Sequence, residues 1–191
     1  MLSLITSNVG FITLLSLFAI GSIGSLLFRK NDALANIWSG FFATVGSLFG
    51  MIFSISSILL KEDLVFKIGT TVFPFLSLSF LIDSLSAFFI LIISLVALFC
   101  SIYGIGYVRH YYKKYSIGEL GFFYNLFIIG MLLVVSASNG IFFLIAWEIM
   151  SVASYFLVIY DRNEKENLKA GFLYLVMTHV GTVFIILALL L

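Results

Sequence analysis

One acidic side chain lies deep inside a long apolar run, where its charge would be costly. Glu148 belongs to FFLIAWEIMSVASYFLV, with eight residues between it and Asn139 and twelve between it and Asp161. In a helix it would lie about 13 Å from one end and 18 Å from the other, too far for its side chain to reach water. An acidic group at the bilayer centre costs on the order of 2.5–3.5 kcal/mol, so it must face protein or water. We interpret Glu148 as a proton-binding site; the alternative is a permanently protonated Glu that hydrogen-bonds between helices.

A histidine lies at a similar depth in the next apolar run. His179 belongs to LYLVMTHVGTVF and is eleven residues past Leu168. Measured from the connection that joins the two runs, His179 would lie about 16 Å deep and Glu148 about 18 Å deep. A carboxylate and an imidazole at one level form a plausible proton relay, because both change protonation state readily. The alternative is a histidine that bonds a backbone carbonyl or Thr178 and never titrates.

Two further charged residues are candidates for proton translocation. Asp83, in FLIDSLSAFF, follows Pro74 by nine residues, which places it about 13 Å into a helix that starts at this proline. It could instead lie in the first turns of its helix, where the helix dipole favours a carboxylate. Lys169 opens the last apolar run and is either an interfacial anchor or an ammonium group that reaches a short way inward.

The elements that carry these residues are predicted from composition. Of 191 residues, 62% are hydrophobic and 10% are charged, whereas a soluble domain is about half apolar and a quarter charged. Only helices satisfy all backbone groups in lipid without closing a barrel. Gly46 and Gly50 form a GxxxG pair that permits close approach of another helix. We predict an all-α integral membrane protein, a single transmembrane domain over 1–191, with six helices at roughly 9–28, 34–60, 75–103, 121–138, 140–160 and 168–191.

The distribution of Lys and Arg predicts the orientation. Eight of the ten lie in three alternate connections, at 29–33, 104–120 and 161–169, and the other two lie in 61–74. The positive-inside rule places the three basic connections in the cytoplasm and both termini outside. The net charge of +1 gives no reason to expect nucleic acid as a partner.

A tyrosine cluster accompanies the basic residues of 104–120. An aromatic and basic band is typical of a helix end anchored at the level of the lipid headgroups, and the alternative is a ligand site. Its members are Tyr103, Tyr107, Tyr111, Tyr112 and Tyr115.

Four stretches resemble a known family. They are AWEIMSVASYFLVIYD at 146–161, DSLSAFF from Asp83, YGIGYV at 103–108 and AGFLYLVMTHVGT at 170–182. They are similar to the antiporter-like proton-translocating subunits of respiratory complex I, multi-subunit sodium/proton antiporters and membrane-bound [NiFe] hydrogenases. ASYFLV followed by VMTHVGT resembles in particular the large membrane subunit of the hydrogenase and formate hydrogenlyase branch. The resemblance covers roughly residues 75–191.

The resemblance implies a role for Glu148 and an incomplete channel. Glu148 matches the family's essential intramembrane glutamate, which pairs with a lysine on a later helix. That helix would follow Leu191, so the sequence corresponds to the N-terminal portion of an antiporter-like subunit. The chain is therefore expected to be a fragment, a split subunit completed by a second chain, or a short paralogue.

The resemblance also implies a function and partners. We expect a proton-handling membrane subunit of an ion-translocating oxidoreductase in the prokaryotic inner membrane, next to other membrane-arm subunits and lipid. The solitary Cys100 excludes a CxxC-type site, so Fe–S clusters and a NiFe centre would belong to peripheral cytoplasmic redox subunits, with no cofactor or catalytic centre in this chain. The alternatives are a cation/proton antiporter subunit and a non-conducting structural paralogue.

Overall fold

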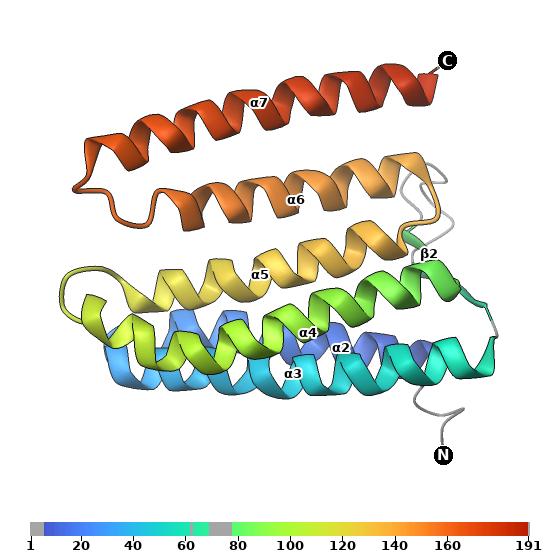
Figure 1. The fold of residues 1–191 in the computed structure, drawn as a ribbon, viewed down its shortest axis with the longest axis horizontal. Helices are drawn as coiled ribbons and strands as arrows, with labels where there is room; N and C mark the ends of the chain where they lie inside the picture. Colours follow the sequence, from blue (N-terminus) through green and yellow to red (C-terminus); the bar gives the residue numbers. More distant parts are fainter. Residues whose placement is uncertain (1–5, 62, 69–77, 191) are drawn as a thin grey trace.

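Six long apolar helices make up most of the molecule. The computed structural model describes residues 6–61, 63–68 and 78–190. Within these ranges the six helices long and apolar enough to cross a membrane lie side by side and alternate in direction (Figure 1). The prediction of an all-α integral membrane protein with six transmembrane helices is confirmed. The helices are α2 (Asn8–Leu27), α3 (Asp32–Leu60), α4 (Ser84–Tyr107), α5 (Ile117–Ser136), α6 (Gly140–Val158) and α7 (Lys165–Leu190).

Polar residues fix where several helices begin. The side chain of Asn31 accepts a hydrogen bond from the Leu34 amide before α3, and that of Asn139 accepts one from the Phe142 amide before α6. Each bond satisfies an amide that has no partner within its own helix. Five of the six helices start within four residues of the predicted positions.

The predicted helix over 75–103 is wrong in its first part. Leu78–Ile82 forms strand β2, which pairs antiparallel with strand β1 (Leu64–Ile68), and α4 begins only at Ser84. A short apolar segment such as 78–82 suits a buried strand as well as the first turns of a helix. Hydropathy alone therefore did not separate the strand from the helix that follows it. Pro74, the predicted helix start, lies outside the described residues.

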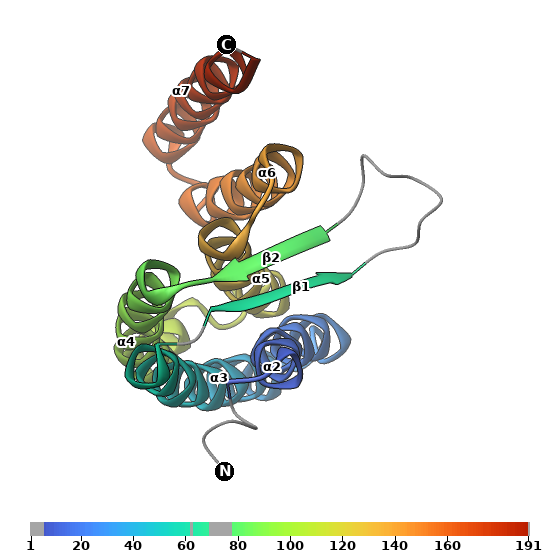
Figure 2. The same cartoon turned by 90° about the vertical axis from the view of Figure 1, so that its right-hand side faces the viewer.

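The two strands form a hairpin that covers one end of the helix bundle (Figure 2). Phe66 of β1 stacks on Phe80 of β2 with ring centroids 4.7 Å apart, and Phe80 also contacts Phe11 and Phe142. The Ser138 amide donates to the Ser79 carbonyl, which fastens the hairpin to the connection between α5 and α6. We call this the hairpin end of the molecule.

Close packing holds α2, α3, α4 and α5 together. Phe18 of α2 is fully buried against Gly46, where an added Cβ atom would lie 3.0 Å from its ring. At Gly50 an added Cβ would lie 2.3 Å from the Ser94 hydroxyl of α4. The GxxxG pair therefore lets α3 approach two neighbours, as predicted.

The last two helices extend the bundle sideways. From α5 outwards, α6 and α7 follow in successive rows (Figures 1 and 2). Gly171 and Thr182 are the buried residues of α7, whereas Phe172, Met177 and Phe184 on the same helix are more than 60% exposed. α7 thus packs on α6 and presents a broad apolar face away from the bundle.

Candidate functional site

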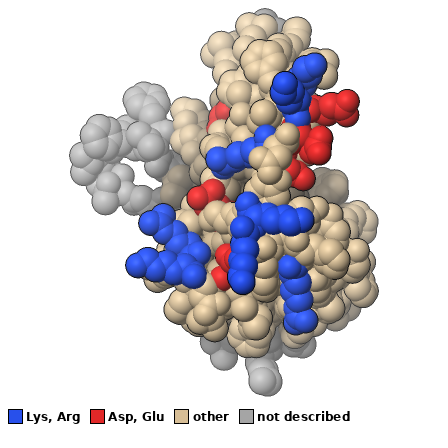
Figure 3. All heavy atoms as spheres, turned by 90° about the vertical axis from the view of Figure 1, so that its left-hand side faces the viewer, with Lys and Arg blue, Asp and Glu red and all other residues tan. Residues whose placement is uncertain are grey.

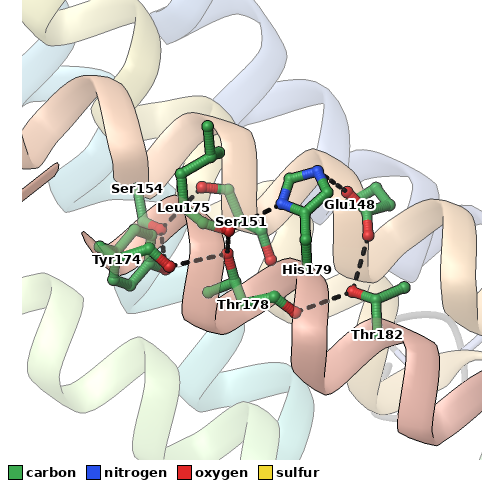
Figure 4. Close-up of polar contacts among 8 residues, drawn as sticks. All are labelled: Glu148, Ser151, Ser154, Tyr174, Leu175, Thr178, His179 and Thr182. Carbon is green, nitrogen blue, oxygen red and sulfur yellow. Dashed lines mark hydrogen bonds and ion pairs between the residues drawn. The ribbon is translucent and has the colours of Figure 1, made fainter. Parts of the chain in front are cut away.

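Glu148 of α6 and His179 of α7 face each other across the interface between the two helices (Figure 4). The Nε2 atom of His179 lies 3.8 Å from Oε2 of Glu148. Both helices run through this level in opposite directions, which is why residues at similar predicted depths meet. The structure therefore brings together the two candidates whose contact the sequence alone left open.

The backbone determines how the histidine presents its nitrogens. Nδ1 of His179 lies 2.8 Å from the carbonyl oxygen of Leu175. A carbonyl only accepts, so Nδ1 carries a hydrogen and donates it. In the neutral ring, Nε2 then presents a lone pair to Glu148.

This arrangement has a consequence for the protons of the pair. A lone pair on Nε2 and an ionised Oε2 would both be acceptors and would repel each other. The contact is favourable when the pair carries one further proton, on Oε2 of Glu148 or on Nε2 of His179; at 3.8 Å it is an electrostatic contact and not a hydrogen bond. The geometry therefore suits a site that holds and exchanges a single proton.

A threonine that the sequence analysis did not single out completes the site. The Thr182 hydroxyl, in a side chain that is 8% exposed, donates to Oε1 of Glu148 at 2.8 Å. The same hydroxyl also lies 3.1 Å from the Thr178 carbonyl. Residues three apart share a helix face, so the spacing of Thr182 from His179 is the sequence feature that could have placed Thr182 at the site.

Further hydroxyl groups lie along the same interface, between Glu148 and the C-terminal end of α6. Ser154 hydrogen-bonds with the hydroxyl of Tyr174 on α7 (Figure 4). Between Ser154 and Glu148, the Ser151 hydroxyl is buried and has no hydrogen-bond partner among the described residues. A buried hydroxyl without a partner is costly, so this position suits a water molecule or a group from outside the described residues.

The pair is only partly enclosed. The side chain of Glu148 is 37% exposed and that of His179 is 54% exposed. Next to them, Leu175, Val176, Val180 and Val183 line a shallow groove on α7. The described residues thus cover the pair from one side.

The other two predicted site residues lie elsewhere. Lys169 is exposed in the first turns of α7, ten residues or about 15 Å from His179, and forms no ion pair with any described residue. Asp83 lies before α4 and accepts a hydrogen bond from the Ser86 amide at 2.7 Å. That bond holds the pKa of Asp83 below its usual value. The second interpretation of Asp83, at the start of its helix, fits this position.

A pair of substitutions separates a capping role of Asp83 from a proton-carrying role. Asp83→Asn should leave stability and proton translocation nearly unchanged, because Asn caps helices as well as Asp does. Asp83→Ala should cost about 1 kcal/mol of stability. Thermal unfolding in detergent and proton uptake by vesicles measure the two effects. Loss of translocation in the Asn variant would contradict the capping role.

The basic connections lie together at the end opposite the hairpin. The ends of α2, α4 and α6 and the starts of α3, α5 and α7 meet there, and Figure 3 shows Lys and Arg side chains gathered on this face. Arg162, between α6 and α7, pairs with Glu119 in the first turn of α5 at 3.6 Å. We call this the basic end of the molecule.

Comparison with known proteins matches two parts of the chain to protein families. The family described as NADH:quinone oxidoreductase/Mrp antiporter, transmembrane, matches residues 137–191, which include Glu148 and His179. The N-terminal family of complex I chain 5 matches residues 74–116. Hydrogenase-4 component B of Escherichia coli (strain K12) is 38% identical over 177 residues, which is 93% of this chain. The chain belongs to the family of antiporter-like membrane subunits.

Two further relatives are subunits of NADH oxidoreductases. NADH-quinone oxidoreductase subunit L of Buchnera aphidicola subsp. Acyrthosiphon pisum is 32% identical over 58% of the chain and 17% of its own length. NADH-ubiquinone oxidoreductase chain 5 of Anopheles quadrimaculatus is 30% identical over 72% of the chain and 24% of its own length. The chain also spans only 26% of the Escherichia coli hydrogenase component. It therefore corresponds to a part of each of these curated relatives.

Proposed function

We propose that this antiporter-like chain handles protons as part of a membrane subunit in a redox-driven, hydrogenase-type complex. The observation that carries the proposal is the contact of Glu148 with His179 inside the span of α6 and α7, where a shared proton makes the contact favourable. The similarity to Hydrogenase-4 component B over most of the chain supports the hydrogenase type.

In this proposal the pair acts as a loading site for one proton. With Glu148 ionised, the site is a carboxylate that accepts a hydrogen bond from Thr182 and forms an ion pair with a protonated His179. A positive charge that approaches the exposed side of the pair favours ionised Glu148 and drives the proton away, whereas its withdrawal favours reprotonation. That side also has room for the lysine-bearing helix that the resemblance implies, from later in the protein or from a second chain.

The proposal extends to orientation and partners. The basic end faces the cytoplasm of a prokaryotic cell, with both chain termini on the outside of the inner membrane. Peripheral redox subunits dock at the cytoplasmic side and carry the Fe–S clusters and the NiFe centre. Other membrane-arm subunits lie next to the exposed apolar face of α7.

A second candidate is a cation/proton antiporter subunit that has no redox partner. The family description that covers α6 and α7 names the Mrp antiporter, and the Glu148 and His179 pair would serve either function. The two candidates differ in what assembles with the chain and in what drives the proton.

Isolation of the native complex through a tag on this subunit tests the proposal. We expect co-purified nickel and iron–sulfur subunits, and we expect proton uptake by inside-out vesicles when hydrogen or formate is oxidised. A complex without redox metals that exchanges sodium for protons would identify the antiporter instead. A complex with redox activity and no proton uptake would identify a structural role for the subunit.

A further inference from the structure

A cavity of about 350 Å³ lies at the basic end, away from the Glu148 site. It is bounded by α3, α4, α5, the end of α6 and the start of α7. The part of α6 nearest to the Glu148 site, at Leu157, is nine residues from Glu148. Its volume falls in the range of about 300–1,000 Å³ that small-molecule sites occupy. The proton-handling proposal assigns no role to this space.

The outer part of the cavity is aromatic and acidic. Tyr107, Tyr111, Tyr160 and Asp161 line it. The ring of Tyr160 lies 5.8 Å from that of Tyr111 and 5.3 Å from that of Tyr115. Electron-rich faces of tyrosine rings attract cations, so this end of the cavity suits a positively charged group.

At this end one carboxylate lacks an ion-pair partner and one hydroxyl lacks a hydrogen-bond partner among the described residues. The Asp161 carboxylate accepts a hydrogen bond from the Tyr115 hydroxyl but forms no ion pair with any described Lys, Arg or His. The Tyr160 hydroxyl is buried and has no hydrogen-bond partner among the described residues. A partly buried carboxylate is usually paired, so these groups call for a cation with hydrogen-bond donors.

The cavity reaches into the span of α4, where apolar side chains lie beside the polar groups of Asn36, Ser39, Ser101 and Tyr124. Cys100 lies seven residues before Tyr107, which corresponds to about 10 Å along the helix. Ile105 and Leu120 line this part, and Cys100 and Val158 on its rim are exposed. On the side of Cys100 and Val158 the cavity therefore meets the apolar surface of the molecule.

We propose that this cavity binds a phospholipid with an ammonium headgroup, such as phosphatidylethanolamine. Asp161 is the counter-ion of the ammonium group, and the rings of Tyr111 and Tyr160 enclose it. The first part of an acyl chain lies past Gly104 towards Cys100. A lipid fits better than a soluble amine because the cavity lies at headgroup level and opens sideways, where lipid surrounds a membrane helix.

The chain offers a matched pair of variants. A Cβ atom at Gly104 or at Gly106 would meet no other atom within 4 Å, so a side chain can leave the backbone at both positions without a clash at its first carbon. Gly104 lines the cavity and Gly106 does not. Gly104→Leu therefore fills the space meant for lipid, and Gly106→Leu controls for the same change on the same helix. Asp161→Asn removes the counter-ion while it keeps the side-chain size.

The test is lipid retention by the native complex, measured by native mass spectrometry after exchange into detergent with added phosphatidylethanolamine or phosphatidylglycerol of equal chain length. We expect one tightly held phosphatidylethanolamine in the wild type and in Gly106→Leu, and at least tenfold weaker retention in Gly104→Leu and Asp161→Asn. Thermal unfolding of each variant confirms that it is folded. Equal retention in all four proteins, equal retention of phosphatidylglycerol, or cross-linking of Asp161 to a lysine of another subunit would each overturn the proposal.

Discussion

Replacement of Glu148 by Gln is expected to reduce proton translocation by the native complex at least tenfold while the complex still assembles. Gln keeps the size of the side chain and can still accept a hydrogen bond from Thr182, so the packing of α6 on α7 should survive. It cannot bind or release a proton, so the contact with His179 would lose the proton that the proposed function assigns to the pair. Fluorescence of a pH-sensitive dye in inside-out vesicles measures the rate.

A matched control is Glu166→Gln, which makes the same change at an exposed position in the first turn of α7. It should leave translocation within about twofold of the wild type, because a surface charge of this kind contributes little. Native gels establish that both variants assemble. Full proton uptake by an assembled Glu148→Gln complex would refute the proton-loading role and favour the interpretation of Glu148 as a permanently protonated hydrogen-bonding group.

The second large effect is expected at His179. His179→Gln should lower translocation about tenfold, because it removes the ring that donates from Nδ1 to Leu175 and offers Nε2 to Glu148. If the two residues act as one unit, the double variant with Glu148→Gln should be no slower than Glu148→Gln alone. Rates of the wild type, the two single variants and the double variant provide the double-mutant cycle.

His110→Gln is the control for this cycle, because His110 lies in the short 3-10 helix η2 (Val108–Tyr111) at the basic end. It should leave the rate unchanged. Additive losses in the double variant would mean that Glu148 and His179 act independently, and the partner of Glu148 would then have to come from another helix.

Much of the fold could be predicted because the bilayer allows few structures. The apolar runs predicted six helices, and Asn31 and Asn139 precede two of them as helix caps. The error at 78–83 has a physical cause. β2 exists because Phe80 pairs with Phe66 and packs on Phe11, and these partners are far apart in the sequence. Hydropathy within one run carries no information about such pairing.

The sequence predicted how deep in the membrane the site residues lie, but not which side of its helix each residue occupies. Counting residues placed Glu148 and His179 at one level, and the structure places their side chains in contact. Which way a residue points around its helix depends on how the helices pack, so the contact was open. Thr182 was missed because a threonine among apolar residues carries no charge to mark it. Lys169 was considered for its charge, but it lies about two to three helical turns from the pair.

The one-sided packing of α7 has a mechanical consequence. Contacts that hold α7 on α6 include Gly171 against Ile159, the hydrogen bond between Tyr174 and Ser154, and the bond from Thr182 to Glu148. One of the points of attachment is therefore part of the proposed proton site. If the site binds a proton as proposed, a movement that slides or tilts α7 therefore changes how tightly the proton is held. Thermodynamic reciprocity then requires that arrival of the proton shifts the preferred position of α7 by the same coupling free energy. Proton binding and the position of α7 are in this sense thermodynamically coupled.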